Sequence, residues 1–218
     1  MDINVIQTKM QPNITQYSGI PFEIFTIDGL YSSEEIKNYL DFVEFADEKN
    51  RGFTNSEFKN GKIIRPDISS KMYSYICPHL PHTYIDRNNT SWKFIQAPKY
   101  IMYAKIKQDQ LFGLHTDTGC EYDEIDNLYS KFTVLTYLND NFDGGHTQFY
   151  NNDFQKTVSI EPKENRTLIF DIDLYHKGDQ ITKGEKYWIG TELVVSKIDT
   201  IYYTEGTVEL VDELVDVV

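Results

Sequence analysis

The 218-residue chain carries 34 acidic and 21 basic residues, which gives a formal net charge of −13. A domain this acidic is repelled by phosphate backbones, and the sequence has no cluster of lysine and arginine interleaved with aromatic residues, so we expect no nucleic-acid partner. Solubility explains most of this charge, with a basic protein or peptide partner as the alternative. Cys77 and Cys120 define neither a paired-cysteine metal motif nor a disulfide framework.

The length fits one domain over residues 1–218. We expect an N-terminal helical support region over 1–95, a β-rich core over 96–196 and a C-terminal extension over 197–218. The first residues lack a basic segment followed by an apolar run, so we expect no signal peptide. No stretch approaches the roughly 18 consecutive apolar residues of a membrane span. A cytoplasmic protein with no membrane partner is therefore expected.

The N-terminal region begins without clear periodicity, and residues 1–20 are expected to be irregular. The alternation of apolar and polar residues over 22–27 predicts a strand. Ser32 and Glu35 form a capping-box pattern, which predicts a helix that starts there. The buried face of that helix is expected to carry Ile36, Leu40, Val43 and Phe45.

Residues 52–66 are polar and are predicted to form a loop. A second helix is predicted over 69–80, ended by prolines. His79 and His82 lie at this proline-rich exit and are interpreted as surface or turn residues and not as metal ligands. The inward side chains of the second helix are expected to be Met72, Tyr75 and Ile76.

The second half of the chain changes to a period of two, with turn signals between short apolar runs. Strands are predicted over 99–107, 131–138, 146–149, 157–160, 166–170 and 186–196. Because no crossover helices separate them, the pattern favours a β-sandwich or jelly roll. The two earlier helices are expected to pack on one sheet of this mainly β fold.

One short segment offers the side chains of a metal site. His115 and Asp117 are two residues apart, and in a β-strand such residues point to the same face. His176 is the candidate third ligand. Two histidines and one carboxylate that leave coordination positions open are typical of non-haem Fe(II) oxygenases.

Four blocks occur in order along the β-rich half of the chain. They are His115-Thr116-Asp117, Tyr137-Leu138-Asn139 with Gly144-Gly145-His146-Thr147, the later His176, and Gly184-Glu185-Lys186-Tyr187. Together they resemble the 2-oxoglutarate- and Fe(II)-dependent dioxygenases, and within them the prolyl 4-hydroxylase-like branch. The resemblance covers roughly residues 95–195, and it implies a double-stranded β-helix, the cupin-like jelly roll, with the N-terminal helices packed on one sheet.

The resemblance also implies roles for individual residues. His115, Asp117 and His176 would hold the iron and form the catalytic centre. Lys186 would pair with the distal carboxylate of 2-oxoglutarate, because a desolvated carboxylate without a partner is costly. Further hydroxyl donors to the same cosubstrate would be Tyr137, Thr147 and Tyr103.

The sequence departs from the family in two places and leaves some assignments open. The glycine that usually precedes a glutamine upstream of the metal motif is Asp109 here, although Gln110 and Phe112 are present. A tyrosine usual before the first metal histidine is replaced here by Lys105 and Ile106, which affects the cosubstrate role of Tyr103. Lys183 competes with Lys186, although a turn lysine is expected to be solvated. Trp188 shares the face of Lys186 and fits either the pocket or the core.

The activity that the resemblance implies is hydroxylation of a C–H bond, first of all in a prolyl residue of a protein or peptide. The cofactor and cosubstrates would be Fe(II), 2-oxoglutarate and O2, with ascorbate as an optional reductant and succinate and CO2 as co-products. The acidic loop at 119–126 fits either a lid over a basic peptide or a solvated loop. The alternatives are a hydroxylase of a free amino acid or metabolite, and a jelly-roll binding protein without turnover. The oligomeric state is not encoded in these patterns.

Overall fold

The computed structural model describes residues 13–17, 23–49, 54–55, 58–119, 122–123 and 127–198. The predicted C-terminal extension and most of the acidic loop at 119–126 lie outside these ranges. Among the described residues, no helix is both long and apolar enough to cross a membrane.

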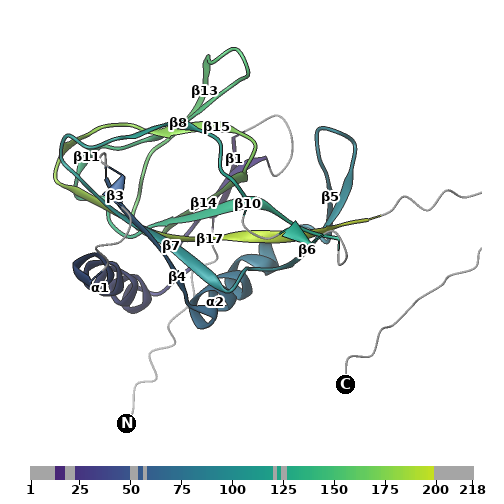
Figure 1. Ribbon diagram of the computed structural model, residues 1–218, viewed down its shortest axis with the longest axis horizontal. Coiled ribbons are helices and arrows are strands. Elements are labelled where there is room, and N and C mark those ends of the chain that lie inside the picture. Colours follow the sequence, from purple (N-terminus) through teal and green to yellow (C-terminus); the bar gives the residue numbers. More distant parts are fainter. Residues whose placement is uncertain are drawn as a thin grey trace, which may run out of the picture.

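A large antiparallel sheet forms the backbone of the fold (Figure 1). Its strands, in spatial order, are β1 (Asn13–Gln16), β2 (Ile24–Asp28), β14 (Arg166–Asp171), β10 (Leu128–Tyr137), β17 (Glu185–Lys197), β7 (Tyr100–Lys107), β4 (Phe58–Ile64) and β3 (Thr54–Asn55). Three further strands lie outside this order. β6 (Ser91–Gln96) pairs with β17 and with β5 (Thr83–Ile85), and β9 (Tyr122–Asp123) pairs with β10. The register between β10 and β17 sets the centre of this sheet, with Tyr137 opposite Trp188.

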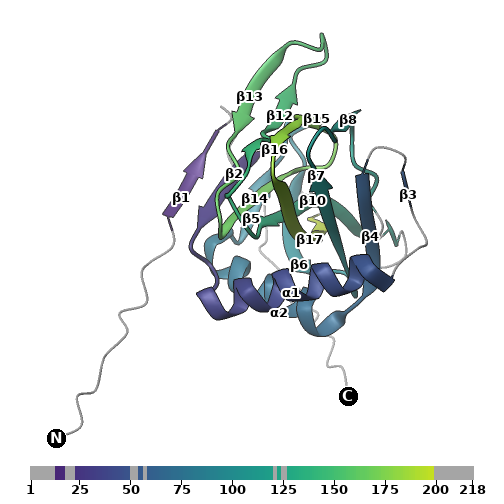
Figure 2. The same ribbon diagram turned by 90° about the vertical axis from the view of Figure 1, so that its left-hand side faces the viewer.

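A smaller sheet packs against one face of the large sheet, and the helices lie on the other face (Figures 1 and 2). Its order is β13 (Lys156–Ile160), β12 (Thr147–Tyr150), β15 (Tyr175–Gly178) and β8 (Phe112–His115). A two-stranded ladder joins β11 (Asp143–Gly144) to β16 (Ile181–Lys183). Two antiparallel sheets of this kind form the expected jelly roll, and the mainly β fold class is confirmed.

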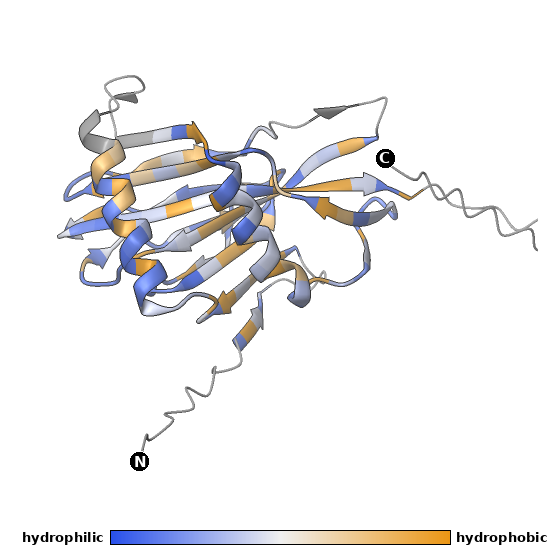
Figure 3. Ribbon diagram, turned by 90° about the horizontal axis from the view of Figure 1, so that it is seen from below, coloured by the Kyte–Doolittle hydropathy of each residue, from blue (hydrophilic) through white to orange (hydrophobic). Residues whose placement is uncertain are grey.

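Two helices cover the other face of the large sheet, as the sequence predicts (Figures 2 and 3). They are α1 (Ser33–Lys49) and α2 (Pro66–Ile76), the latter followed by a 3₁₀ turn over Cys77–His79. The capping box is confirmed, because the Ser32 amide donates to Glu35 Oε2 at 2.8 Å and the Glu35 amide donates to Ser32 Oγ at 3.2 Å.

The buried face of α1 differs from the prediction at one position. Ile36 and Val43 are buried, but Phe45 is 55% exposed, and Ala46 takes the buried place instead. The reason is helical geometry, since residue 46 lies one turn beyond Val43 while residue 45 points to another side. The inward placement of Met72 and Ile76 in α2 is confirmed, because both are fully buried.

Three local predictions in the N-terminal half are wrong. Part of residues 1–20 forms β1, which pairs with β2. The expected loop at 52–66 contains β3 and β4, and β4 extends the large sheet by pairing with β7. α2 begins at Pro66, three residues before the predicted start, since proline is well suited to the first turn of a helix.

Candidate active site

His115, Asp117 and His176 converge in the structure from two segments. His115 ends β8 and stands opposite His176 of β15 in the strand register. One ligand atom from each of the three side chains lies within 4.8 Å of the others. The predicted strand geometry is wrong for Asp117, because β8 ends at His115. Asp117 is instead held by its amide, which donates to the Ile172 carbonyl at 3.0 Å.

Each of the two imidazoles is oriented by a hydrogen bond to the backbone carbonyl two residues before it. Nδ1 of His115 donates to the Gly113 carbonyl at 2.8 Å, and Nδ1 of His176 donates to the Leu174 carbonyl at 2.9 Å. These bonds fix the tautomer and leave Nε2 of each ring as the ligand atom, as in most metal-binding histidines. His115 Nε2 is buried and makes no hydrogen bond among the described residues, although Asp117 Oδ1 lies 3.3 Å away. A buried nitrogen that makes no hydrogen bond and lies beside a carboxylate fits a metal ligand.

The carboxylate of Asp117 is held by a residue that the sequence reasoning missed. Thr133 Oγ1 donates to Asp117 Oδ2 at 2.5 Å, and Thr133 lines the same cavity from β10. Thr133 shares its strand face with Tyr137, so the period of two could have identified it. The neighbouring imidazoles and this hydroxyl outweigh the effect of burial, and the pKa of Asp117 is lowered.

The two histidines are affected differently by their surroundings. Burial lowers the pKa of His176. Burial acts in the same direction on His115, but the carboxylate of Asp117 outweighs it, and the pKa of His115 is raised. The triad therefore joins a carboxylate that is ionised at neutral pH with an imidazole whose neutral form burial favours, which suits a divalent cation.

Lys186 is a buried cation at the inner end of the same cavity. Its side chain is 3% exposed, its Nζ donates to the Gly145 carbonyl at 2.6 Å, and Nζ lies 4.8 Å from the centroid of the Tyr137 ring. Burial lowers the pKa of Lys186 to about 7. Within the described residues, no carboxylate lies within ion-pair distance of it. An ammonium in this setting is costly unless an anion joins it, so the geometry fits an anionic ligand.

Thr147 and Tyr137 both lie near Lys186, Thr147 at the cavity wall and Tyr137 behind Thr147. Thr147 lines the cavity, and its Oγ1 is 2.7 Å from the hydroxyl of Tyr137. Tyr137 is fully buried behind it. The structure thus places Thr147 in the cavity wall and the Tyr137 hydroxyl against Thr147 Oγ1.

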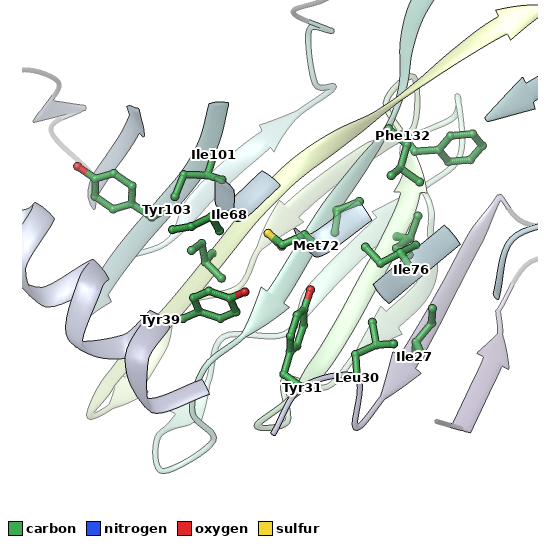
Figure 4. Close-up of a cluster of buried hydrophobic side chains, with 14 of the residues drawn as sticks. Ile27, Leu30, Tyr31, Tyr39, Ile68, Met72, Ile76, Ile101, Tyr103 and Phe132 are labelled. Carbon is green, nitrogen blue, oxygen red and sulfur yellow. The ribbon is translucent and has the colours of Figure 1, made fainter. Parts of the chain in front are cut away.

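The expected contact between Tyr103 and the cosubstrate is wrong. Met102 and Ile106 of β7 line the cavity, and Tyr103 points to the opposite face of the strand. There its ring packs against Phe42 of α1, with ring centroids 6.0 Å apart. Figure 4 shows Tyr103 within the buried cluster beneath the helices, together with Ile101. Ile106 occupies the corresponding place on the cavity side.

The other open assignments are resolved by position. Trp188 lines the cavity, two residues from Lys186 on the same face of β17. Lys183 is exposed on β16, so Lys186 is the lysine of the cavity. His146 does not line this cavity and lies in a separate depression with Asp143.

The cavity that these residues share has a volume of about 560 Å³, within the range of small-molecule sites. Its wall is mainly apolar and includes Phe112, Leu135 and Phe170. It is continuous between the metal-ligand candidates and Lys186. An apolar wall lowers the local dielectric constant, and charge interactions inside the cavity are therefore stronger than in water.

Comparison with known proteins identifies related folds. Residues 99–191 match the family model described as the 2OG-Fe(II) oxygenase superfamily. No curated protein matches the chain.

Similar solved structures include a collagen prolyl hydroxylase of Paramecium Bursaria Chlorella virus-1 in complex with 2-oxoglutarate (19% identity, 80% of this chain and 96% of that one, TM-score 0.51). A Pseudomonas putida prolyl-4-hydroxylase is 12% identical over 79% of this chain and 92% of its own, with a TM-score of 0.54. A Trichoplax adhaerens prolyl hydroxylase, bound to a peptide fragment of the hypoxia inducible factor oxygen degradation domain, is 18% identical over 79% and 84%, with a TM-score of 0.57. At these identities the likeness establishes a shared fold.

Proposed function

We propose that this chain is a 2-oxoglutarate- and Fe(II)-dependent dioxygenase, like the 2OG-Fe(II) oxygenase superfamily whose model residues 99–191 match, and that it hydroxylates a prolyl residue of a protein or peptide. One observation carries the proposal. His115, Asp117 and His176 form one cluster, and Asp117 and His176 of that cluster line the same cavity as Lys186. Lys186 is buried and has no carboxylate partner among the described residues. This combination suits a divalent cation and an anionic cosubstrate side by side.

In this proposal His115, Asp117 and His176 hold Fe(II). The backbone carbonyls of Gly113 and Leu174 keep both imidazoles oriented, and their Nε2 atoms are free to bind. Thr133 holds one carboxylate oxygen of Asp117, which leaves Oδ1 toward His115. Three protein ligands leave the remaining coordination positions to the cosubstrates.

Lys186 binds the distal carboxylate of 2-oxoglutarate, with the Thr147 hydroxyl as a second donor. The carbonyl of Gly145 and the ring of Tyr137 hold the ammonium in place. Tyr137 acts through Thr147 and Lys186 and is therefore a positioning residue. Its hydroxyl is 2.7 Å from Thr147 Oγ1, which orients that group toward the cavity.

The bound iron and cosubstrate supply the oxidation of the C–H bond, with succinate and CO2 as co-products. The protein contributes orientation and exclusion of water. Ile106, Leu135 and Trp188 provide an apolar wall around the reacting groups. Such a wall protects a reactive centre from side reactions with solvent.

A small-molecule substrate is the second candidate, and one observation favours it. The cavity of about 560 Å³ must hold the cosubstrate as well as the reacting part of the substrate, which suits a free amino acid or a single side chain. A binding protein without turnover has no need for the buried Lys186, whose isolated charge is costly.

The test is incubation of the full chain with Fe(II), 2-oxoglutarate and O2, together with a collagen-like peptide, a hypoxia-inducible-factor peptide or free L-proline. We expect succinate formation that depends on one of the peptides, with one oxygen atom added to a prolyl residue as detected by mass spectrometry. His176→Ala should abolish both signals, and His79→Ala should keep them, because His79 lies in the 3₁₀ turn away from the cavity. Hydroxylation of free proline alone would favour the second candidate, and no oxygen transfer to any of the three would contradict prolyl hydroxylation.

A further inference from the structure

One charged side chain of the cavity has no role in the proposed function. The polar and charged lining residues within the described part of the chain are Lys62, Asp117, Thr133, Thr147, His176 and Lys186. The metal site uses Asp117, His176 and Thr133, and the cosubstrate site uses Thr147 and Lys186. Lys62 is the remaining residue of this set and has no assigned role. It lies on β4, a strand that the sequence analysis did not predict.

The side chain of Lys62 is held in a defined place at the cavity. Lys62 stands opposite Met102 in the register of β4 and β7, and both residues line the cavity. Its Nζ lies 3.4 Å from the centroid of the Tyr100 ring, and Tyr100 is itself 7% exposed. A cation over a buried aromatic face is attracted to it, so the ammonium is positioned and not merely solvated.

The two lysines of the cavity differ in accessibility. Lys186 is buried, whereas Lys62 is exposed to solvent. Lys62 is therefore a cavity residue that a substrate from solution can reach. Among the described residues, no carboxylate lies within ion-pair distance of Lys62.

The net charge of the whole protein affects how an anionic substrate could bind near Lys62. With a formal net charge of −13, the chain repels anionic molecules at long range. A substrate with a carboxylate would therefore need a fixed cation at the site, and the remaining wall offers mainly apolar side chains such as Met102 and Phe112.

We propose that Lys62 binds a carboxylate of the primary substrate and selects substrates that carry a carboxylate near the aliphatic carbon to be hydroxylated. The inference rests on the proposed function, because that function assigns the other polar side chains. Two sources share this chemistry, namely the carboxylate of a free acid or amino acid and the acidic side chain of a peptide.

The test measures binding near the metal without turnover. The full chain is loaded with Mn(II), a redox-inert stand-in for Fe(II) under these conditions, and with saturating 2-oxoglutarate. Broadening of probe proton signals by Mn(II) is then followed for three acid and amide pairs: N-acetyl-L-proline and its amide, isovalerate and isovaleramide, and acetyl-Pro-Glu-amide and acetyl-Pro-Gln-amide. The first two pairs represent free acids, and the third represents a peptide.

We expect the acid of at least one pair to be broadened more than its amide. Lys62→Met should reduce that preference about tenfold, a change that corresponds to about 1.4 kcal/mol. Methionine keeps a long apolar chain on the Tyr100 ring but removes the charge, so packing is conserved. Lys62→Arg should retain the preference, and so should Lys93→Met, which removes an exposed lysine of β6 outside the cavity wall.

Several results would overturn the proposal. Equal broadening of acids and amides, or no broadening of any acid, would mean that no carboxylate is selected here. A preference that persists in Lys62→Met would assign it to another group, and loss of 2-oxoglutarate broadening in that variant would assign Lys62 to the cosubstrate. If 2-oxoglutarate itself were not broadened in the wild-type chain, the proposed function would fail instead, and the two failures are thereby distinguished.

Discussion

At the scale of single residues, Lys186 is the side chain with the most specific expected role. Replacement by methionine removes the cation while keeping an apolar chain of similar length in the buried site. We expect Lys186→Met to raise the KM for 2-oxoglutarate by more than about tenfold, since a desolvated carboxylate then loses its charged partner. The measurement is the KM for 2-oxoglutarate at saturating Fe(II), and Lys183→Met is the matched control on the exposed neighbouring lysine. An unchanged KM in Lys186→Met would show that this role is wrong.

The lowered pKa of Lys186 leads to a second prediction. Burial holds this pKa at about 7 in the absence of ligand, so above pH 7 the free site is mostly neutral. A bound dianion favours the charged ammonium and raises the pKa, so 2-oxoglutarate binding at about pH 8 should take up a proton. Below about pH 6 the lysine is already protonated, and the uptake should vanish.

Calorimetric titrations in two buffers of different ionisation enthalpy measure this uptake directly. Affinity for 2-oxoglutarate should also fall as the pH rises above 7, since each binding event must then protonate the lysine. Binding enthalpies that are the same in both buffers at pH 8 would contradict a neutral Lys186 in the free protein. The Lys186→Met variant serves as the control that lacks the titrating group.

Sequence patterns were most informative where chemistry and spacing coincide in one short segment. They predicted His115 and Asp117 from two ligand types that are two residues apart, whereas Lys186 was predicted from the resemblance to a family. The structure brings His115, Asp117 and His176 together. They failed for Tyr103, whose position alone did not show which face of its strand it occupies. Thr133 could have been placed by its strand face, which it shares with Tyr137, whereas Lys62 carries no signature of its own and only the fold shows that it reaches the cavity.

At the scale of secondary-structure elements, the start of α1 depends on one side chain. Burial opposes the ionisation of Glu35, but hydrogen bonds from Lys71, Ser32 and Tyr75 outweigh it and lower the pKa of Glu35 from 4.5 to about 2. A lowered carboxyl pKa stabilises the fold above the ordinary pKa, and this stabilisation is lost as the pH falls toward 2. Glu35 thus joins the start of α1 to α2 through Lys71, at 2.7 Å.

We expect Glu35→Gln to lower the free energy of unfolding by about 1 kcal/mol at pH 7. The difference from the wild-type chain should shrink as the pH falls from about 4.5 toward 2, since Glu35 is then protonated in both states. Denaturant titrations at a series of pH values measure it. Glu34→Gln is the matched control, because Glu34 lies exposed in the same first turn, and an equal effect of both changes would contradict the capping role.

Elements with a strong local signal were predicted well, and those that depend on tertiary pairing were not. The capping box and the alternating runs over 99–107 and 166–170 correspond to α1, β7 and β14. β4 was missed because it contains two lysines, an asparagine and a glycine, and its pairing with β7 determines its conformation. Short strands such as β8 and β15 have too few residues to show a period.

At the scale of the whole molecule, one face of the large sheet packs against the helices and the other face lines the cavity. The helices α1 and α2 cover one face with the main apolar cluster (Figure 3). The other face lies toward β8, β12 and β15 (Figure 2). Residues of that face and of these three strands line the cavity. Because His115 and His176 lie on adjacent strands of the smaller sheet, a metal ion bound there also connects the loop that carries Asp117 to that sheet.

This arrangement predicts that ligands stabilise the fold as a whole. With Mn(II) and 2-oxoglutarate together at about 100 times their dissociation constants, the free energy of unfolding should rise by about 2.7 kcal/mol or more. Thermal unfolding with and without ligands measures this shift. The shift should disappear in His176→Ala or after addition of a chelator and should persist in His79→Ala; an equal shift in both variants would mean that the ligands bind elsewhere.

The central claim is that His115, Asp117 and His176 hold iron beside a 2-oxoglutarate site in one cavity. The most direct test is an anaerobic titration of the purified chain with Fe(II) and 2-oxoglutarate, followed by visible absorption. We expect a weak metal-to-ligand charge-transfer band that requires both components and is lost in His176→Ala. If no band forms with both components present, the proposed iron and cosubstrate sites are wrong.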